Sequence, residues 1–158
     1  MANGNDPNAE GYLAPVEATV YGDVEVTLDG TAFIQRNKIP QEGANPVPFS
    51  GRVFGCNNLN GSPKSNVTVK VLKTVMLDDN NQPTTGHDEN KFDVHSVYGG
   101  GNLSAYQPVD NTKTIWVIVN GCDDVTVEKV FGGGNSAGVT DPTVLILACV
   151  KDGYAFAG

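Results

Sequence analysis

The segment SVYGGGNLSAY at residues 96–106 is followed by a close copy, KVFGGGNSAGV, at residues 129–139. In both copies three consecutive glycines follow a valine and an aromatic residue, and an asparagine comes directly after them. Such glycines either let the backbone turn sharply or bring it close to a ligand. Other features of the sequence distinguish between these two roles.

The valine, aromatic and glycine triplet is an internal repeat. It occurs at residues 20–22, 53–55, 97–99 and 130–132, so that its first and third intervals are equal and its second is longer. The longer interval contains a polar stretch at residues 77–91, which we expect to be an inserted surface loop. A repeat of this length is typical of units that stack on one another to bury a shared core.

Each unit also contains a segment in which apolar and polar residues alternate. These segments cover residues 24–30, 67–73, 115–119 and 143–150. Period-two alternation with many β-branched residues predicts strands, and no segment of similar length has the period of a helix. The sequence therefore predicts an all-β fold.

Two all-β architectures fit these strands. The first is a β-solenoid, similar to a parallel β-helix, of about four degenerate units, with Tyr21, Phe54, Tyr98 and Phe131 stacked as a core ladder. The second is an antiparallel β-sandwich, in which residues 120–124 form a hairpin loop between strands at 115–119 and 125–130. In either case we expect one β-repeat domain over residues 16–158, preceded by an extended or disordered segment at 1–15.

Charge and hydropathy exclude several partners. The 158 residues carry a formal net charge of −8 with only 10 Lys and Arg, which argues against a nucleic-acid partner. The first residues have neither a basic nor an apolar region of the kind found in a signal peptide. The longest apolar run, residues 144–150, is too short to span a membrane, so we expect no membrane insertion.

The glycine triplets lack the signatures of known ligand loops. There is no GxxxxGK followed by Ser or Thr, no GxGxxG that opens a helix, and no aspartate in the position used by calcium-binding repeats. We therefore interpret them as structural turns of residues that tolerate positive φ. The predicted turn residues are Gly99, Gly100, Gly101, Asn102, Gly132, Gly133, Gly134 and Asn135, and no cofactor is predicted.

Other groups carry weaker signals. His87, Asp88, Asp93 and His95, and separately Asp78 and Asn80, have metal-ligand side chains, but their polar surroundings favour a solvated surface, so no metal site is predicted. Carboxylates such as Asp123, Asp124 and Glu128 leave glycoside cleavage open as an alternative. We expect Trp116 to be buried. The cysteines Cys56, Cys122 and Cys149 have no metal-binding spacing, and either three buried thiols or one disulfide fits them.

The repeat phrases VYGDVEVTLDG, VFGCNNLNGSP, VYGGGNLSAY and NGCDDVTVEKVFGGGNSAGV resemble those of adhesin-like secreted or cell-surface proteins of gut Bacteroidetes. The resemblance covers residues 19–150 and implies a parallel β-helix, a secreted or cell-surface location and no catalytic motif. The first unit departs from the pattern, since Asp23 stands where a glycine would be expected.

From these observations we expect a non-catalytic structural or adhesive module. The open alternatives are a self-assembling extracellular filament subunit and a β-helix that binds or degrades a polysaccharide. The expected partners are a surface glycan, a protein ligand or further copies of the chain.

Overall fold

The computed structural model describes residues 18–33, 37–39, 47–49, 51–76, 80, 82, 94–121, 125, 127–139, 143–148 and 154–156. These residues form strands, turns and bends, and none of them is helical. The predicted all-β class is therefore confirmed. The segment at 1–15 and nearly all of the stretch at 77–91 lie outside the described residues.

Two four-stranded sheets make up most of the structure. The first has the order β1 (Val24–Phe33), β5 (Val67–Met76), β7 (Ile115–Asn120), β9 (Thr143–Ala148). The second has the order β10 (Tyr154–Phe156), β8 (Val127–Phe131), β6 (Val94–Tyr98), β4 (Gly51–Phe54). Every pair of neighbours in both sheets is parallel. A separate pair, β2 (Asn37–Ile39) and β3 (Val47–Phe49), is antiparallel.

This parallel pairing does not fit the antiparallel sandwich. The hairpin that it requires would pair residues 115–119 with residues 125–130. Instead, β7 and β8 belong to different sheets, and each pairs with strands from other units. The short connection at residues 121–126 therefore leads from one sheet to the other.

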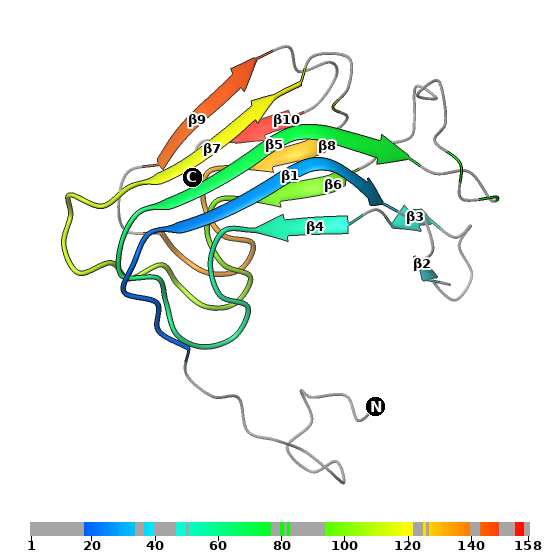
Figure 1. The fold of residues 1–158 in the computed structure, drawn as a ribbon. Coiled ribbons are helices and arrows are strands. Elements are labelled where there is room, and N and C mark those ends of the chain that lie inside the picture. Colours follow the sequence, from blue (N-terminus) through cyan, green and yellow to red (C-terminus); the bar gives the residue numbers. More distant parts are fainter. Residues whose placement is uncertain are drawn as a thin grey trace, which may run out of the picture.

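The chain visits the two sheets in turn. It runs through β1 and then β4, through β5 and then β6, through β7 and then β8, and finally through β9 and β10. Figure 1 shows the arrows of the first sheet pointing one way across the front, while those of the second sheet point back behind it. Isolated parallel bridges between Val20 and Pro63 and between Tyr106 and Val139 join the turns that lead back to the first sheet. Within the described part of the chain both sheets are open, and β1, β9, β4 and β10 are their edge strands.

The core lies between the two sheets and is built from columns of β-branched residues. In β7 the side chains of Ile115, Val117 and Val119 are at most 1% exposed, and the register sets them beside Val67, Val69 and Val71 of β5. The second sheet contributes a facing column of Val53, Val97 and Val130. Full burial of one such side chain stabilises the folded chain by about 1.5–3 kcal/mol, so each column depends on having a strand on both sides.

The first unit does not follow the spacing that the sequence indicates. Val20 forms a bridge with Pro63, well beyond the predicted counterpart Val53. The reason is that β1 starts at Val24, directly after the first triplet, whereas the whole turn at residues 55–66 separates the end of β4 from β5. The equality of the first and third intervals is therefore a coincidence. Only the second and third intervals relate residues that pair with one another in the second sheet.

Candidate functional site

The predicted turn residues lie where the chain crosses from the second sheet to the first, Gly99–Asn102 between β6 and β7 and Gly132–Asn135 between β8 and β9. Among the glycines with described surroundings, only Gly30 and Gly61 have positive φ, at 70° and 78°. The expectation that the triplets use positive φ is therefore wrong for Gly99, Gly100, Gly101 and Gly134. These positions have another reason to be glycine.

That reason is the close approach of successive turns. A Cβ at Gly99 would lie 2.5 Å from the carbonyl oxygen of Gly132 and 2.5 Å from Cγ2 of Ile115, closer than real Cβ atoms come. A Cβ at Gly55 would in turn lie 2.3 Å from the carbonyl oxygen of Gly99. The glycine positions thus form a backbone stack that leaves no room for a side chain.

The amides of this stack are already used. The N–H of Gly99 donates to the carbonyl of Phe131 at 2.9 Å, and the N–H of Gly100 donates to the carbonyl of Gly133 at 3.0 Å. A phosphate-binding loop needs backbone N–H groups that point at the ligand. These two N–H groups instead join one turn to the next, which supports a structural role.

An asparagine ladder follows the glycines. The Asn102 side-chain N–H donates to Oδ1 of Asn58 at 2.8 Å, and the Asn135 side-chain N–H donates to Oδ1 of Asn102 at 2.8 Å. The backbone N–H groups of Leu103 and Ser136 make matching bonds of 2.8 Å to the carbonyls of Asn58 and Asn102. Asn58 was not singled out in the sequence, although it lies 44 positions before Asn102, at the interval of the repeat.

The aromatic residues at the ends of β4, β6 and β8 form a second ladder. The rings of Phe54 and Tyr98 are stacked with centroids 4.8 Å apart, and those of Tyr98 and Phe131 are stacked at 4.7 Å. The preceding residues, including Val97, face the core, and successive side chains of a strand point to opposite faces. The aromatic ladder therefore lies on the face of the second sheet opposite these valines, where its middle ring, Tyr98, is nevertheless buried at 6% exposure.

Three of the four predicted ladder members, Phe54, Tyr98 and Phe131, do stack, and Tyr98 in the middle is buried. The valines that precede them belong to the hydrophobic cluster between the sheets. The fourth member needs a correction. Tyr21 is not part of the ladder, because its side chain is 78% exposed and the preceding Val20 pairs with Pro63 and not with Val53. The two later repeat intervals predict the three true members, and Tyr21 falls outside them.

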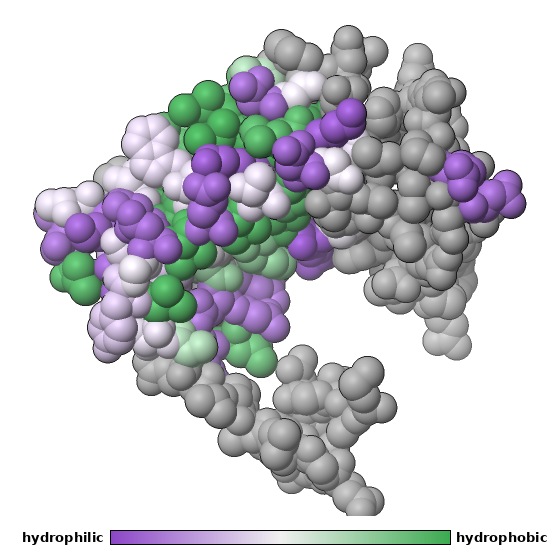
Figure 2. All heavy atoms as spheres, viewed as in Figure 1, coloured by the Kyte–Doolittle hydropathy of each residue, from purple (hydrophilic) through white to green (hydrophobic). Residues whose placement is uncertain are grey.

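The outer face of the first sheet is divided into a polar and an apolar half. The register places Glu25 and Thr68 in one row with Trp116 and Val144, and Thr27 and Lys70 in the next row with Ile118 and Ile146. Figure 2 shows hydrophobic residues gathered over β7 and β9, with hydrophilic residues beside them over β5 and β1. Trp116 is 39% exposed and Ile146 is 42% exposed.

The expectation that Trp116 is buried is therefore wrong. The alternation along β7 divides the side chains into the two predicted sets, but the set that faces the core is Ile115, Val117 and Val119. Three β-branched residues pack in columns with the valines of β5, which leaves the larger indole outside.

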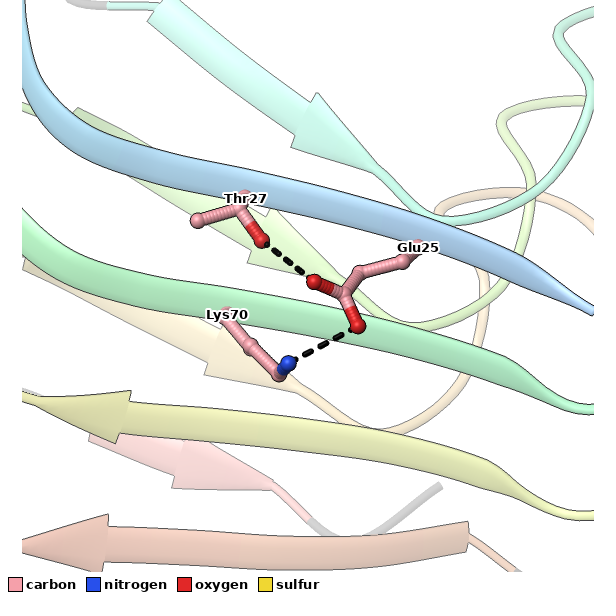
Figure 3. A network of polar contacts seen from close by, with 3 residues as sticks. All are labelled: Glu25, Thr27 and Lys70. Carbon is pink, nitrogen blue, oxygen red and sulfur yellow. Dashed lines mark hydrogen bonds and ion pairs between the residues drawn. The ribbon is translucent and has the colours of Figure 1, made fainter.

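The polar half is organised by a single carboxylate. Nζ of Lys70 lies 2.8 Å from Oε2 of Glu25, and the Thr27 hydroxyl donates to Oε1 of the same carboxylate at 3.1 Å (Figure 3). The hydrogen bond from Lys70 is the main reason that the pKa of Glu25 is held below its usual value. This network joins β1 to β5 across the surface.

A serine, a histidine and a glutamate meet on the second sheet. Nδ1 of His95 lies 3.1 Å from the Ser96 hydroxyl, and Nε2 of His95 lies 3.3 Å from Oε2 of Glu128. Burial lowers the pKa of His95, and the Glu128 carboxylate opposes this effect. The sequence did not indicate the His95–Glu128 contact, although the separation of these two residues equals that of the two glycine triplets.

This group resembles a nucleophile with its base, but the serine has no access to a substrate. Ser96 is 0% exposed, so its hydroxyl cannot reach a molecule from solution without local opening. A nucleophilic mechanism needs the attacking oxygen within reach of the reacting atom. The three side chains therefore act as a polar contact between β6 and β8.

The remaining candidate ligands are mostly not described. His87, Asp88, Asp93 and Asp78 lie outside the described residues, as do Cys122, Cys149, Asp123 and Asp124. Within the part of the chain that is described, no three His, Cys, Asp or Glu side chains are grouped to hold a metal. Cys56 is a free, partly buried thiol whose Sγ lies 3.6 Å from the carbonyl oxygen of Gly99, and burial raises its pKa to about 12.

Among the described residues, no helix has the length and hydropathy to cross a membrane. No protein-family model, no curated protein and no solved structure matches this chain.

Proposed function

We propose that this chain is a non-catalytic β-solenoid module with a structural or adhesive role. The observation that carries the proposal is the equivalence of successive units. Residues 44 or 33 positions apart occupy the same place in the valine column of the second sheet, the glycine stack, the asparagine ladder and the aromatic ladder. All four features run across the strands and therefore hold one unit on the next.

Such an arrangement makes each unit depend on its neighbours. A single pair of strands cannot bury its valines or satisfy its ladder amides, whereas a stack of units can. The stability of the module is then a sum over interfaces between units. This property suits a protein whose task is to provide a stiff scaffold, since further units can be added without a new core.

Two observations support a non-catalytic role. The serine closest to a histidine and a carboxylate is fully buried. The backbone amides of Gly99 and Gly100 donate to the neighbouring turn. The described groups that most resemble a catalytic or ligand-binding site are thus engaged in holding the units together.

The outer face of the first sheet is the surface that we assign to contacts with other molecules. Trp116 offers an exposed ring, and Thr68 occupies the neighbouring position of the same row. Aromatic rings beside polar groups suit both protein and carbohydrate partners. The resemblance of the repeats to adhesin-like proteins would place this surface outside the cell.

Duplication of one unit tests the proposal. A second copy of residues 99–131, inserted after Phe131, adds one further repeat of β7 and β8 in the existing register. For a β-solenoid, the longer chain should fold with a similar β-sheet signal per residue in circular dichroism. Its free energy of unfolding in urea should be at least that of the parent chain, because the copy adds one more interface between units.

The matched control is a Gly and Ser insertion of equal length at the same point. It should destabilise the fold, because it lengthens the connection between β8 and β9 without adding a strand to either sheet. The proposal is wrong if the duplicated unit destabilises the chain as much as this control does. A closed domain with one fixed core would give that result.

A further inference from the structure

The edge strands at the two ends of the stack match one another in direction. Because both sheets are parallel throughout, β9 could accept β1 of another copy as its next parallel neighbour without any reversal. The second sheet has the same polarity, with β10 at one end and β4 at the other. Edge strands present unpaired N–H and C=O groups, and these readily pair with another strand.

The core columns are complete inside the stack and incomplete at its end. Val119 in β7 is 1% exposed, whereas Leu147, its partner in the register of β9, is 38% exposed. The column containing Val117 shows the same trend, since Leu145 is only partly buried. An additional strand beside β9 would cover both leucines.

Strand β1 carries residues that fit these positions. If β1 of a second copy continued the register of the sheet beyond β9, its Leu28 would lie beside Leu147 and its Val26 beside Leu145. Leu28 is 7% exposed, and Val26 is partly buried against the core. Apolar residues would therefore meet apolar residues along both columns, as they do between every pair of strands inside the sheet.

Other exposed apolar side chains also gather at the two ends. Val20 and Tyr21 precede β1 and are 43% and 78% exposed, and Ile146 of β9 is 42% exposed. On the side formed by the turns, the bridges run from Val20 to Pro63 and from Tyr106 to Val139. A copy stacked on β9 would therefore bring its Val20 to the free side of Val139.

We propose that copies of this chain associate end to end, with β9 of one copy pairing in parallel with β1 of the next. The proposal rests on the β-solenoid architecture proposed above and names a second copy as its partner. The interface is heterologous and does not close, so it generates an open filament. Four strands spaced about 4.8 Å apart span only about 14 Å, so a long rod requires this association or further units.

Charge sets the conditions for association. Each copy carries a formal net charge of −8, so copies repel one another at low ionic strength. Salt screens this repulsion. We therefore expect larger assemblies at high than at low sodium chloride concentration.

Two variants, each blocked at one end, test the proposal by sedimentation velocity. Leu147→Lys places a charge at the β9 end, and Val26→Lys places one at the β1 end. Inward-pointing charges on edge strands prevent pairing, and lysine at these partly exposed sites can extend its amine to solvent. The parent chain should grow in mass with concentration without stopping at a dimer, and each variant alone should stay monomeric.

A mixture of the two variants gives the decisive result. The β9 end of the Val26→Lys chain and the β1 end of the Leu147→Lys chain remain free, so an equimolar mixture should form a dimer and nothing larger. A parent chain that stays monomeric, a variant that still grows alone, or a mixture that stays monomeric would each overturn the proposal. If circular dichroism shows that Val26→Lys is unfolded, the double change Val20→Lys and Tyr21→Lys replaces it at exposed positions.

The unit-duplication experiment separates this proposal from the function on which it rests. If the duplicated chain folds and the parent chain stays monomeric, end-to-end association is wrong and the solenoid module stands. If the duplicated chain fails to fold, the solenoid proposal itself fails.

Discussion

Gly99 and Gly132 occupy equivalent turns, and a Cβ added to Gly99 would lie 2.5 Å from the carbonyl oxygen of Gly132. Gly99→Ala should therefore force the two turns apart. We expect a loss of about 1–3 kcal/mol in the free energy of unfolding, as for other overpacked sites. Equilibrium denaturation in urea measures this change.

Gly138 provides the matched control, since nothing lies within 4 Å of a Cβ at this position and its φ is not positive. Gly138→Ala should change the stability by less than about 1 kcal/mol, and reduced freedom of the unfolded chain favours a gain. Equal losses at both positions would show that the turns are not closely stacked.

The middle ring of the aromatic ladder should matter most. Tyr98 stacks on both Phe54 and Phe131 and is 6% exposed, so Tyr98→Ala should cost about 3 kcal/mol. Tyr98→Leu keeps most of the apolar contact and isolates the loss of stacking, about 0.5–1.5 kcal/mol for each ring pair. Tyr21→Ala, at a 78% exposed position, should change the stability by less than about 0.5 kcal/mol. A large loss in the free energy of unfolding for Tyr21→Ala would instead show that Tyr21 packs in the aromatic ladder.

The asparagine ladder predicts a difference between its middle and its end. Asn102 both donates to Asn58 and accepts from Asn135, so Asn102→Ala removes two hydrogen bonds and should cost about 1–2 kcal/mol. Asn135→Ala removes only the bond to Asn102 and should cost about half as much. A double-mutant cycle on Asn102 and Asn135 should give a coupling energy above about 0.5 kcal/mol. Additive effects would contradict a ladder.

His95 makes the stability depend on pH. Burial lowers its pKa below the ordinary value of 6.5, so the unfolded chain takes up a proton before the folded chain does. This contribution to stability is therefore lost as the pH falls from above 6.5 through the lowered folded-state pKa. The free energy of unfolding of the parent chain minus that of His95→Gln should decrease as the pH falls. Urea denaturation of both proteins at several pH values measures this difference.

Glu128 supplies an independent check on His95. Its carboxylate raises the pKa of His95 and partly offsets burial, so Glu128→Gln should lower that pKa further. An NMR titration of the His95 ring follows the pKa directly. A value at or above 6.5 in the folded parent chain would contradict the assigned cause.

The sequence predicted the parts of the structure that depend on local alternation and on the repeat. The strands at 67–73 and 115–119 follow from alternating β-branched residues, and the stacking of Phe54, Tyr98 and Phe131 follows from the spacing of the triplets. The direction of pairing was not decided by these patterns, because an alternating strand fits parallel and antiparallel neighbours equally well. The structure settles this point through the pairing of β5, β7 and β9.

The side of a strand that faces the core was harder to predict. Along β7 one set contains the large Trp116 and the other contains Ile115, Val117 and Val119, and hydropathy alone does not separate them. The facing columns of valine in β5 decide the matter, and they come from another unit. The contacts of Asn58 with Asn102 and of His95 with Glu128 could likewise be predicted only by applying the spacing between units, 44 or 33 positions, to polar residues.

Nuclear Overhauser effects between strands, measured in isotopically labelled protein, distinguish parallel from antiparallel pairing. The pairing described above predicts Hα to N–H contacts of the parallel type that connect Val69 with Val117 and Val117 with Leu145. Strong Hα to Hα contacts between residues 115–119 and 125–130 would instead show an antiparallel hairpin. That result would contradict the stacked parallel units and every ladder derived from them.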